Sequence, residues 1–184
     1  DALAARIVTI HQDINLVQSM TIAENVFLNN EPVRRPFGLI RREAMRAQVA
    51  TLLERCEIPA RPDDLVSDLP NDLKKMVQIA RAVVMDPKIL LMDEPTSSLT
   101  DVEVKIVLRL MRNLAAQGVG IVLISHYLTE IFEVCDDVTV MRDGQIVADG
   151  PVAATSLPAV VTQMIGRSLD TARPARVTRP PGAT

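Results

Sequence analysis

The stretch that decides the fold is Lys88-Ile89-Leu90-Leu91-Met92-Asp93-Glu94-Pro95-Thr96-Ser97-Ser98-Leu99-Thr100. Four consecutive apolar residues end abruptly in two carboxylates and a proline, which is typical of a strand buried on both faces of a parallel sheet. Pro95 has no N–H to continue a strand ladder, so the chain leaves the sheet there. The acidic end then lies at the carboxyl edge, where open α/β sheets bind ligands. Taken alone, the pattern also fits a core strand with a solvated acidic turn.

The two carboxylates suit phosphate chemistry. Asp93 is placed to hold a Mg²⁺ ion, usually through water, and Glu94 to orient or polarise a water molecule for attack on a phosphate. The downstream sequence favours this interpretation. A second buried strand over 121–124 ends on Ser125-His126. Because both strands of a βαβ unit end at the same edge of one sheet, we expect His126 to lie beside Glu94.

The segment between these strands is predicted to be a helix. Thr100 and Glu103 have the spacing of a capping box at its start, and Gln117-Gly118 ends it. The apolar stripe of this helix is predicted to consist of Val102, Ile106, Leu110 and Leu114.

Together these motifs resemble those of ABC-type ATPases. Residues 89–96 resemble the Walker B segment, residues 97–101 with Ser98 and Asp101 resemble the D-loop, and 124–126 resemble the switch-histidine segment. The sugar-uptake ATPases of the ribose and galactoside import type are most similar, over roughly residues 7 to 166. The resemblance implies an α/β P-loop NTPase core with a parallel sheet and an inserted helical subdomain, and it implies ATP and Mg²⁺ as ligands.

Gln12 follows a predicted first strand and resembles the Q-loop glutamine of the family, which contacts Mg²⁺ and the attacking water. The helical subdomain is then expected at about residues 13–85, and its surface would receive a coupling helix from a membrane partner. Thr21 and Glu24 form a second predicted capping box. Residues 31–39 are predicted to be an exposed loop, and 41–57 an amphipathic helix. The apolar side of that helix is predicted to include Ala44, Val49, Leu52, Leu53 and Cys56.

The chain departs from the family at the signature segment, Leu69-Pro70-Asn71-Asp72, which precedes a helix predicted at about Leu73 to Met85. The family pattern is Leu-Ser-x-Gly, and it donates to the γ-phosphate of ATP on the opposite protomer. Pro70 supplies neither hydroxyl nor N–H. Asp72 places a negative charge towards phosphate oxygens, where like charges at about 4 Å cost on the order of several kcal/mol. The helix itself should survive, because proline suits a first turn.

The phosphate-binding loop of the family, Gly-x-x-x-x-Gly-Lys-Ser/Thr, is absent from these 184 residues. It would precede the first strand. Two expectations therefore remain open: the sequence is a fragment that is incomplete at its amino end, or it is a natural product that cannot hold phosphates alone.

Composition and charge limit the other possibilities. The chain is 48% hydrophobic and 23% charged with a net charge of −3, which suits one domain with an adequate core. Only 2% of residues are aromatic and no basic cluster is present, which argues against a nucleic-acid surface. No apolar run is long enough to span a bilayer. Cys56 and Cys135 match no metal-binding spacing and are predicted to be reduced packing residues.

The remaining segments complete one domain over residues 1–166. We predict a helix from Leu128 to Val134, then two strands that meet in a hairpin turn at Asp143-Gly144. A last helix begins near Ser156-Leu157-Pro158 and ends at Gly166. Residues 167–184 are rich in Arg, Pro, Thr and Ala, and are predicted to be a disordered linker or tail.

The sequence thus predicts an ATP-binding and ATP-hydrolysing subunit of a monosaccharide importer, with Glu94, His126 and Gln12 catalytic. By resemblance its partners are a second ATPase half, integral-membrane permease subunits and, indirectly, a periplasmic sugar-binding protein. It would be peripheral on the cytoplasmic face of the inner membrane. The alternative is a non-catalytic module for dimerisation and membrane docking. A soluble ABC protein of DNA repair or translation fits less well, because residues 12 to 28 match importers.

Overall fold

The structure is a computed structural model that describes residues 5–34 and 39–166. The chain divides into two compact units, Asp1–Val134 and Cys135–Thr184. The predicted domain over 1–166 therefore spans the first unit and the described part of the second. The predicted linker, 167–184, lies outside the described residues. Within the described ranges, no helix combines the length and the apolar character needed to cross a membrane.

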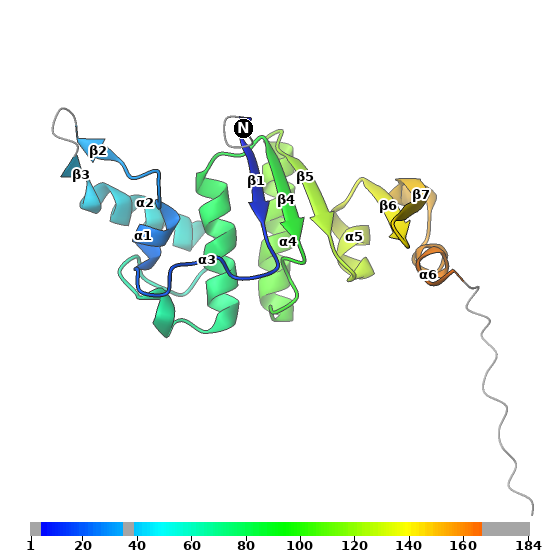
Figure 1. Ribbon diagram of the computed structural model, residues 1–184, viewed down its shortest axis with the longest axis horizontal. Coiled ribbons are helices and arrows are strands. Elements are labelled where there is room, and N and C mark those ends of the chain that lie inside the picture. Colours follow the sequence, from blue (N-terminus) through cyan, green and yellow to red (C-terminus); the bar gives the residue numbers. More distant parts are fainter. Residues whose placement is uncertain (1–4, 35–38, 167–184) are drawn as a thin grey trace, which may run out of the picture. The chain divides into compact units, whose positions relative to one another are not determined.

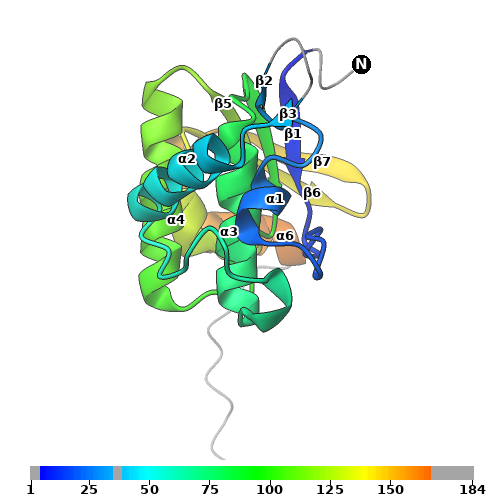
Figure 2. The same ribbon diagram turned by 90° about the vertical axis from the view of Figure 1, so that its left-hand side faces the viewer.

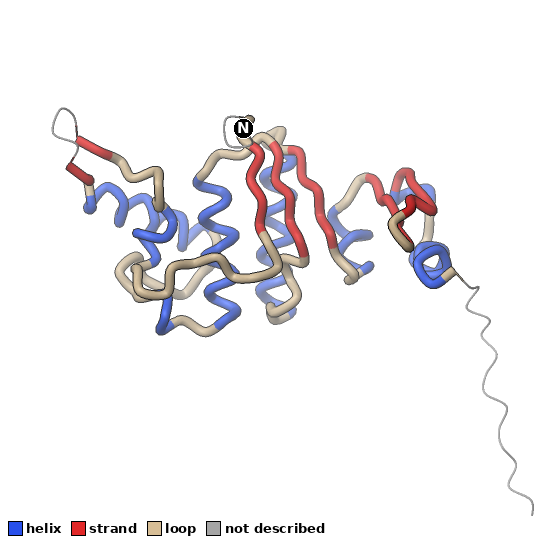
Figure 3. Tube along the Cα trace, in the orientation of Figure 1, coloured by secondary structure: helices blue, strands red, loops and turns tan. Residues whose placement is uncertain are grey.

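The first unit is built around a parallel sheet of three strands, β1 (Ile7–Ile10), β4 (Ile89–Asp93) and β5 (Gly120–Ile124), in the order β1-β4-β5. Helix α3 (Asn71–Val84) leads into β4, and α4 (Asp101–Ala116) connects β4 to β5. In Figures 1 and 3, α4 lies behind β4, and α3 lies beside β1. The predicted βαβ unit is confirmed, so the three strands end at one common edge.

The two faces of this sheet differ in burial. On the face towards the helices, Val8, Leu90 and Met92 are at most 7% exposed. On the opposite face, Val122 and Ile124 are 50% and 57% exposed. The prediction that residues 89–93 are buried on both faces is therefore wrong for the described part of the chain, because α3 and α4 pack against one face only.

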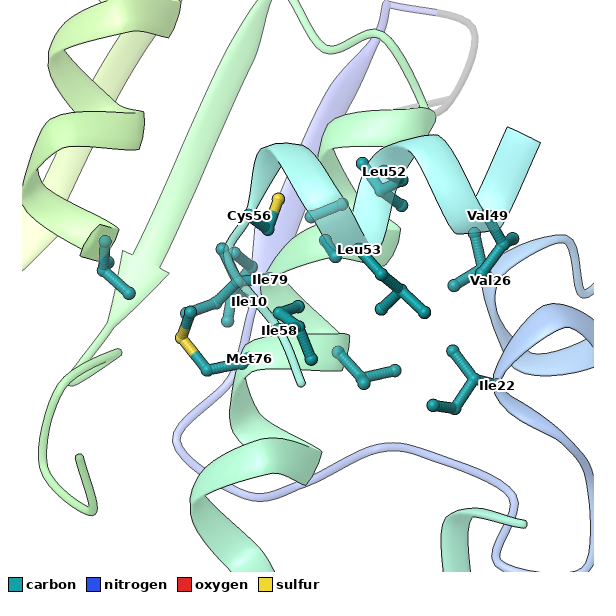
Figure 4. Close-up of a cluster of buried hydrophobic side chains, with 14 of the residues drawn as sticks. Ile10, Ile22, Val26, Val49, Leu52, Leu53, Cys56, Ile58, Met76 and Ile79 are labelled. Carbon is teal, nitrogen blue, oxygen red and sulfur yellow. The ribbon is translucent and has the colours of Figure 1, made fainter. Parts of the chain in front are cut away.

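Further helices pack against α3 on the side away from the sheet. Figure 2 shows α1 (Ile22–Val26) and α2 (Arg42–Arg55) in front of α3. Their apolar side chains join those of α3 and β1 in one buried cluster (Figure 4). The labelled members of this cluster are Ile10, Ile22, Val26, Val49, Leu52, Leu53, Cys56, Ile58, Met76 and Ile79. A short 3-10 helix, Val66–Asp68, precedes α3.

Two details of this region differ from the sequence prediction. Met45 is buried on α2, whereas the predicted Ala44 is only partly buried, because the inward stripe passes through 45, 49, 52 and 53. The predicted loop over 31–39 includes a short antiparallel pair, β2 (Val33–Arg34) and β3 (Leu39–Ile40).

Both predicted capping boxes are present. Thr21 and Glu24 cap α1, and Thr100 and Glu103 cap α4. The predicted apolar stripe of α4 needs correction, because Val102 in its first turn is 70% exposed and Leu110 is only partly buried. The buried residues of this helix are Ile106, Val107, Leu108, Met111 and Leu114. Helix α5 (Leu128–Val134) ends the first unit with the predicted bounds.

The second unit contains the predicted hairpin and the last helix. Strands β6 (Asp137–Arg142) and β7 (Gln145–Pro151) are antiparallel. Asp143 and Gly144 turn between them with φ of 51° and 75°, as a two-residue turn of this hand requires. A 3-10 turn, Val152–Ala154, leads to α6 (Leu157–Ile165), which Gly166 ends with φ of 74°. Left-handed backbone at this position is why glycine suits the helix end.

Candidate active site

The carboxyl edge of the sheet carries the predicted site residues in spatial order. Ile10 pairs with Met92, so Gln12 follows the end of β1 next to the end of β4. Asp93 pairs with Ile124 across β4 and β5. The Glu94 N–H extends this ladder by donating to the Ile124 carbonyl at 2.9 Å. The sheet register thus brings Gln12, the two carboxylates and His126 to three neighbouring strand ends.

Glu94 and His126 are in direct contact. Nδ1 of His126 lies 2.8 Å from Oε1 of Glu94, which confirms the adjacency predicted from the βαβ unit. The Glu94 side chain is 26% exposed and that of His126 is 55% exposed, so the pair faces solvent. The Tyr127 ring lies against the imidazole, with ring centroids 4.1 Å apart. This aromatic contact limits the orientations available to the imidazole.

The backbone of Glu94 is itself unusual. Its φ of 44° lies in the left-handed region, which non-glycine residues adopt at a cost of about 1 kcal/mol or more. The N–H of Glu94 is held by Ile124, and the Glu94 carbonyl accepts from the Ser97 hydroxyl at 3.2 Å. These bonds on both sides hold the turn that carries the Glu94 side chain out of the strand direction.

A buried polar pair supports this turn from behind. Oγ1 of Thr96 donates to Oε2 of Glu130 on α5 at 2.8 Å, and the two residues are 3% and 7% exposed. Burial raises the pKa of the Glu130 carboxyl above its ordinary value, and the Thr96 hydrogen bond partly opposes this. Glu130 could not be identified from the sequence, because nothing local distinguishes it from the exposed Glu133 on the same helix.

The loop that carries Gln12 is held by α3. Gln12 is exposed, but its carbonyl accepts from Nζ of Lys75 at 2.7 Å, and Lys75 also donates to the His11 carbonyl at 2.8 Å. Lys75 is only 1% exposed. The role of Lys75 was not predictable from the sequence, since a lysine in an amphipathic helix is normally solvated.

The signature segment forms the start of α3. Pro70 is the N-cap residue, with extended backbone and no side-chain capping bond, and the helix begins at Asn71, two residues before the predicted start. Oδ1 of Asp72 accepts from the N–H of Leu73 at 2.8 Å. Leu69 is half-buried before the helix. Among the described residues, no hydrogen bond joins this segment to Glu94 or His126.

The D-loop residues follow Glu94 in the chain. Ser98 is exposed in the turn after β4, and Asp101 is the exposed first residue of α4. An open cavity of about 350 Å³ between this turn and α5 is lined by Thr96, Asp101 and Glu130 among others. Neither Glu94 nor His126 lines this cavity.

The predicted oxygen ligands are too few to hold a hard cation without help from water or substrate. In residues 5–34 and 39–166, no group of three or more His, Cys, Asp or Glu side chains is arranged to hold a metal ion. The predicted donors, the Asp93 carboxylate and the Gln12 amide, are two oxygen ligands. Mg²⁺ characteristically combines one or two protein oxygens with water and substrate phosphates. The donor set therefore fits Mg²⁺ held together with a nucleotide, not a protein cage.

Proteins with similar sequences are known. Residues 1–97 match the family model described as ABC transporter. A ribose/galactose/methyl galactoside import ATP-binding protein of Agrobacterium fabrum is 44% identical over 177 residues, which is 96% of this chain and 35% of that protein. The similarly named protein of Burkholderia ambifaria is 43% identical over 98% of this chain and 34% of its own length. The chain thus spans about a third of the length of these curated relatives.

Solved structures show the same fold. The ADP conformation of an ATP-binding cassette of an ABC transporter has a TM-score of 0.69 and 25% identity, covering 90% of this chain and 70% of that one. A dimeric ATP-binding cassette in a post-hydrolysis state with ADP and Pi has a TM-score of 0.69 and 23% identity, covering 80% and 63%.

Proposed function

The chain belongs to the ABC transporter family, and on that premise we propose that it is part of an ATPase subunit that powers import of a monosaccharide. The names of the relatives, import ATP-binding proteins for ribose, galactose and methyl galactoside, support a sugar as the cargo. The comparisons lend no support to the non-catalytic alternative. The observation that carries the proposal is the 2.8 Å contact between Glu94 and His126 at adjoining strand ends.

Asp93 and Gln12 would hold Mg²⁺ at the end of the sheet. The ion, when bound, would neutralise negative charge on the phosphate oxygens of ATP. Asp93 suits this role because it is the last residue of β4, and its pairing with Ile124 of β5 fixes its backbone. Gln12 would also contact the attacking water, and its position depends on the loop that α3 holds.

Glu94 would orient or polarise the attacking water, and His126 would contact the γ-phosphate. An ionised carboxylate only accepts hydrogen bonds, so in the observed pair Nδ1 of His126 donates to Glu94. Nε2 can then donate to a phosphate oxygen only when the imidazole carries both protons. In this proposal Glu94 therefore has two roles, because it orients the attacking water and it fixes the orientation of the His126 ring through their hydrogen bond.

Ser98, Asp101 and the signature segment would act across a dimer interface. In this proposal the Walker B and switch residues serve the site on their own half, and Leu69 to Asp72 would complete the site of a second ATPase half. Because Pro70 and Asp72 replace the serine and glycine of the signature, that second site would be degenerate. The result would be an asymmetric pair with one hydrolytic site and one impaired site.

The remaining partners follow from the same proposal. Integral-membrane permease subunits would dock on the helical subdomain at about residues 13–85, with a periplasmic sugar-binding protein acting through them. The subunit would be peripheral on the cytoplasmic face of the membrane. Substrate choice would lie with the binding protein and the permease, so the particular sugar is a property of those components.

The test is Glu94→Gln in the full-length protein that carries this chain, assembled with its permease. Removing the charge while keeping the shape should reduce ATP hydrolysis by about 10²-fold or more, with ATP binding retained. The matched control is Glu133→Gln on α5, which removes an exposed carboxylate of the same type that pairs with Arg112. Wild-type hydrolysis in Glu94→Gln, or an equal loss in the control, would contradict the proposal.

A further inference from the structure

Lys75 is the most deeply buried charged side chain of the described part of the chain. Its residue is 1% exposed, and its ammonium group donates to two backbone carbonyls, those of His11 at 2.8 Å and Gln12 at 2.7 Å. Asp13 and Asp93 are the acidic groups whose charges act on it, but neither forms an ion pair with it within the described residues. Burial lowers the pKa of Lys75 from its ordinary value, and those two carboxylates partly offset the effect.

Two more side chains of α3 bind the same loop. Nε2 of Gln78 donates to the Asp13 carbonyl at 3.1 Å, and Nη1 of Arg81 donates to the Asn15 carbonyl at 3.2 Å. Residues 75, 78 and 81 are three apart, so they lie along one side of the helix. The chain from His11 to Asn15 therefore follows α3 by means of successive carbonyl contacts.

These contacts provide partners that the sheet does not. β1 ends at Ile10, so the next carbonyls have no strand neighbour to pair with. A buried ammonium group needs acceptors, and the carbonyls of His11 and Gln12 supply them to Lys75. The ammonium group and the two carbonyls satisfy each other, so moving the loop away from α3 would leave the Lys75 charge without these hydrogen bonds. Such an unpaired charge is strongly unfavourable, which makes the loop and the helix move together.

We propose that Lys75 is a positioning residue that fixes the Gln12 loop to α3, so that the helix beginning at the signature segment and the loop carrying Gln12 form one mechanical unit. Lys75 does not reach the reacting atoms in this account and acts only through the placement of Gln12. The effect on ATP hydrolysis rests on the proposed function, whereas the order of the loop does not.

The first test measures the loop through the amide that follows it. Backbone hydrogen exchange is compared between wild type, Lys75→Met and Lys75→Gln, the glutamine variant keeping two N–H donors without the charge. In Lys75→Met the amide of Val17, which donates to Oδ1 of Asn25 at 2.7 Å directly after the loop, should exchange about 10- to 100-fold faster, while the amides of β4 are unchanged. Lys75→Gln should restore part of the protection. The control is Lys74→Met, which removes the neighbouring lysine and its single 3.3 Å bond to the Ser67 carbonyl.

The second test measures hydrolysis in the full-length protein with its permease. Lys75→Met should lower kcat by about tenfold or more and change KM for ATP by less than about threefold, because Gln12 is proposed to act on the attacking water. Lys74→Met should leave both values as in wild type.

The outcomes separate the two proposals. Wild-type exchange at Val17 in Lys75→Met, or a loosened loop with wild-type kcat, overturns the positioning role. Absence of hydrolysis in the wild type counts against the proposed function instead, and Val17 exchange then decides the inference about the loop. If Lys75→Met does not fold, the same two measurements on Lys75→Gln decide it, with intermediate Val17 protection and intermediate kcat as the expected result.

Discussion

The carboxyl end of β4 and the amino end of α3 both carry motifs expected to contact a nucleotide. The motif after β4 keeps both its chemical groups and its helix cap, whereas the motif at α3 keeps the helix start without the groups that would bind phosphate. After β4, Asp93 and Glu94 keep their carboxylates, and the following helix has a complete cap from Thr100 and Glu103. At α3, Pro70 occupies the N-cap with φ of −66° and ψ of 161° and makes no capping bond. Asp72 bonds to the backbone of its own neighbour.

The backbone requirement of a helix start and the chemical requirement of a phosphate site are therefore separable. A helix start needs extended backbone at its N-cap residue, and the φ of proline allows this conformation. A phosphate site needs hydroxyl and N–H donors, which proline lacks. The fold can therefore survive a substitution that removes the chemistry, and α3 still buries seven of its residues. Substitutions can either remove functional groups near the end of β4, where the motif is intact, or restore the missing groups of the signature segment at α3.

The largest effect is expected at the intact side. His126→Ala in the assembled transporter should reduce ATP hydrolysis by about 10²- to 10³-fold, because a donor to the γ-phosphate and the partner of Glu94 are both lost. Steady-state phosphate release measures this. Tyr127→Phe keeps the aromatic ring against the imidazole and should stay close to wild type. Full activity of His126→Ala would remove the histidine from the mechanism.

The next effect is expected from repairing the altered side. Pro70→Ser combined with Asp72→Gly restores a hydroxyl, N–H donors and neutrality, and should raise ATP hydrolysis by about tenfold, equivalent to about 1.4 kcal/mol. Asn71→Ser between them is the matched control and should change little. An unchanged rate in the double variant would show that the signature does not limit hydrolysis.

A smaller effect is expected on the free energy of unfolding when the N-cap residues of α4 and α3 are changed. Thr100→Ala should lower the free energy of unfolding by about 1 kcal/mol, because the α4 cap loses its side-chain bond. Pro70→Ser alone should not lower it, and should raise it by up to about 1 kcal/mol as α3 gains a capping hydroxyl. Urea unfolding measures both. Equal destabilisation by the two changes would contradict the difference between the caps.

The smallest effect is expected on the pH dependence of stability and comes from the buried pair of Thr96 and Glu130. The pKa of Glu130 is raised in the folded state by burial, so the folded state binds this proton more tightly than the unfolded chain does. The contribution to stability is therefore present below the ordinary carboxyl pKa and is lost as pH rises through the folded pKa. Glu130→Gln keeps an acceptor for Thr96 and has no such loss.

The variant should accordingly be more stable than wild type at pH 8, by about 1 kcal/mol or less, and the advantage should shrink towards pH 4. Tm measured across this range tests the sign. An advantage that grows as pH falls would contradict it.

Much of the fold was predictable from local patterns. The carboxylates after an apolar run indicated the end of β4, and the Ser/Thr-x-x-Glu spacing located the starts of α1 and α4 because capping involves neighbours in sequence. The contact of His126 with Glu94 followed from strand order alone. The catalytic roles of these residues stay predictions until the experiments above are done.

Other features depended on neighbours that no local pattern reveals. Val102 has the spacing of a buried residue, yet it is 70% exposed, since it lies in the first turn of α4. The residues of one sheet face are as apolar as those of the other, and only packing distinguishes Ile124 from Met92. Glu130 and Lys75 look like ordinary surface charges until their partners are known.

Local sequence was therefore enough to locate most helices and strands, though not the short β2–β3 pair, together with the capping boxes and the chemically active residues at the strand ends. These follow from short-range sterics, hydrogen bonding and periodicity. Which sheet face is covered, and which polar groups are buried together, depends instead on how the elements pack. The tertiary structure brings Lys75 to the carbonyls of His11 and Gln12 across 64 and 63 positions of sequence, and such a contact exists only after the helix has packed against the sheet.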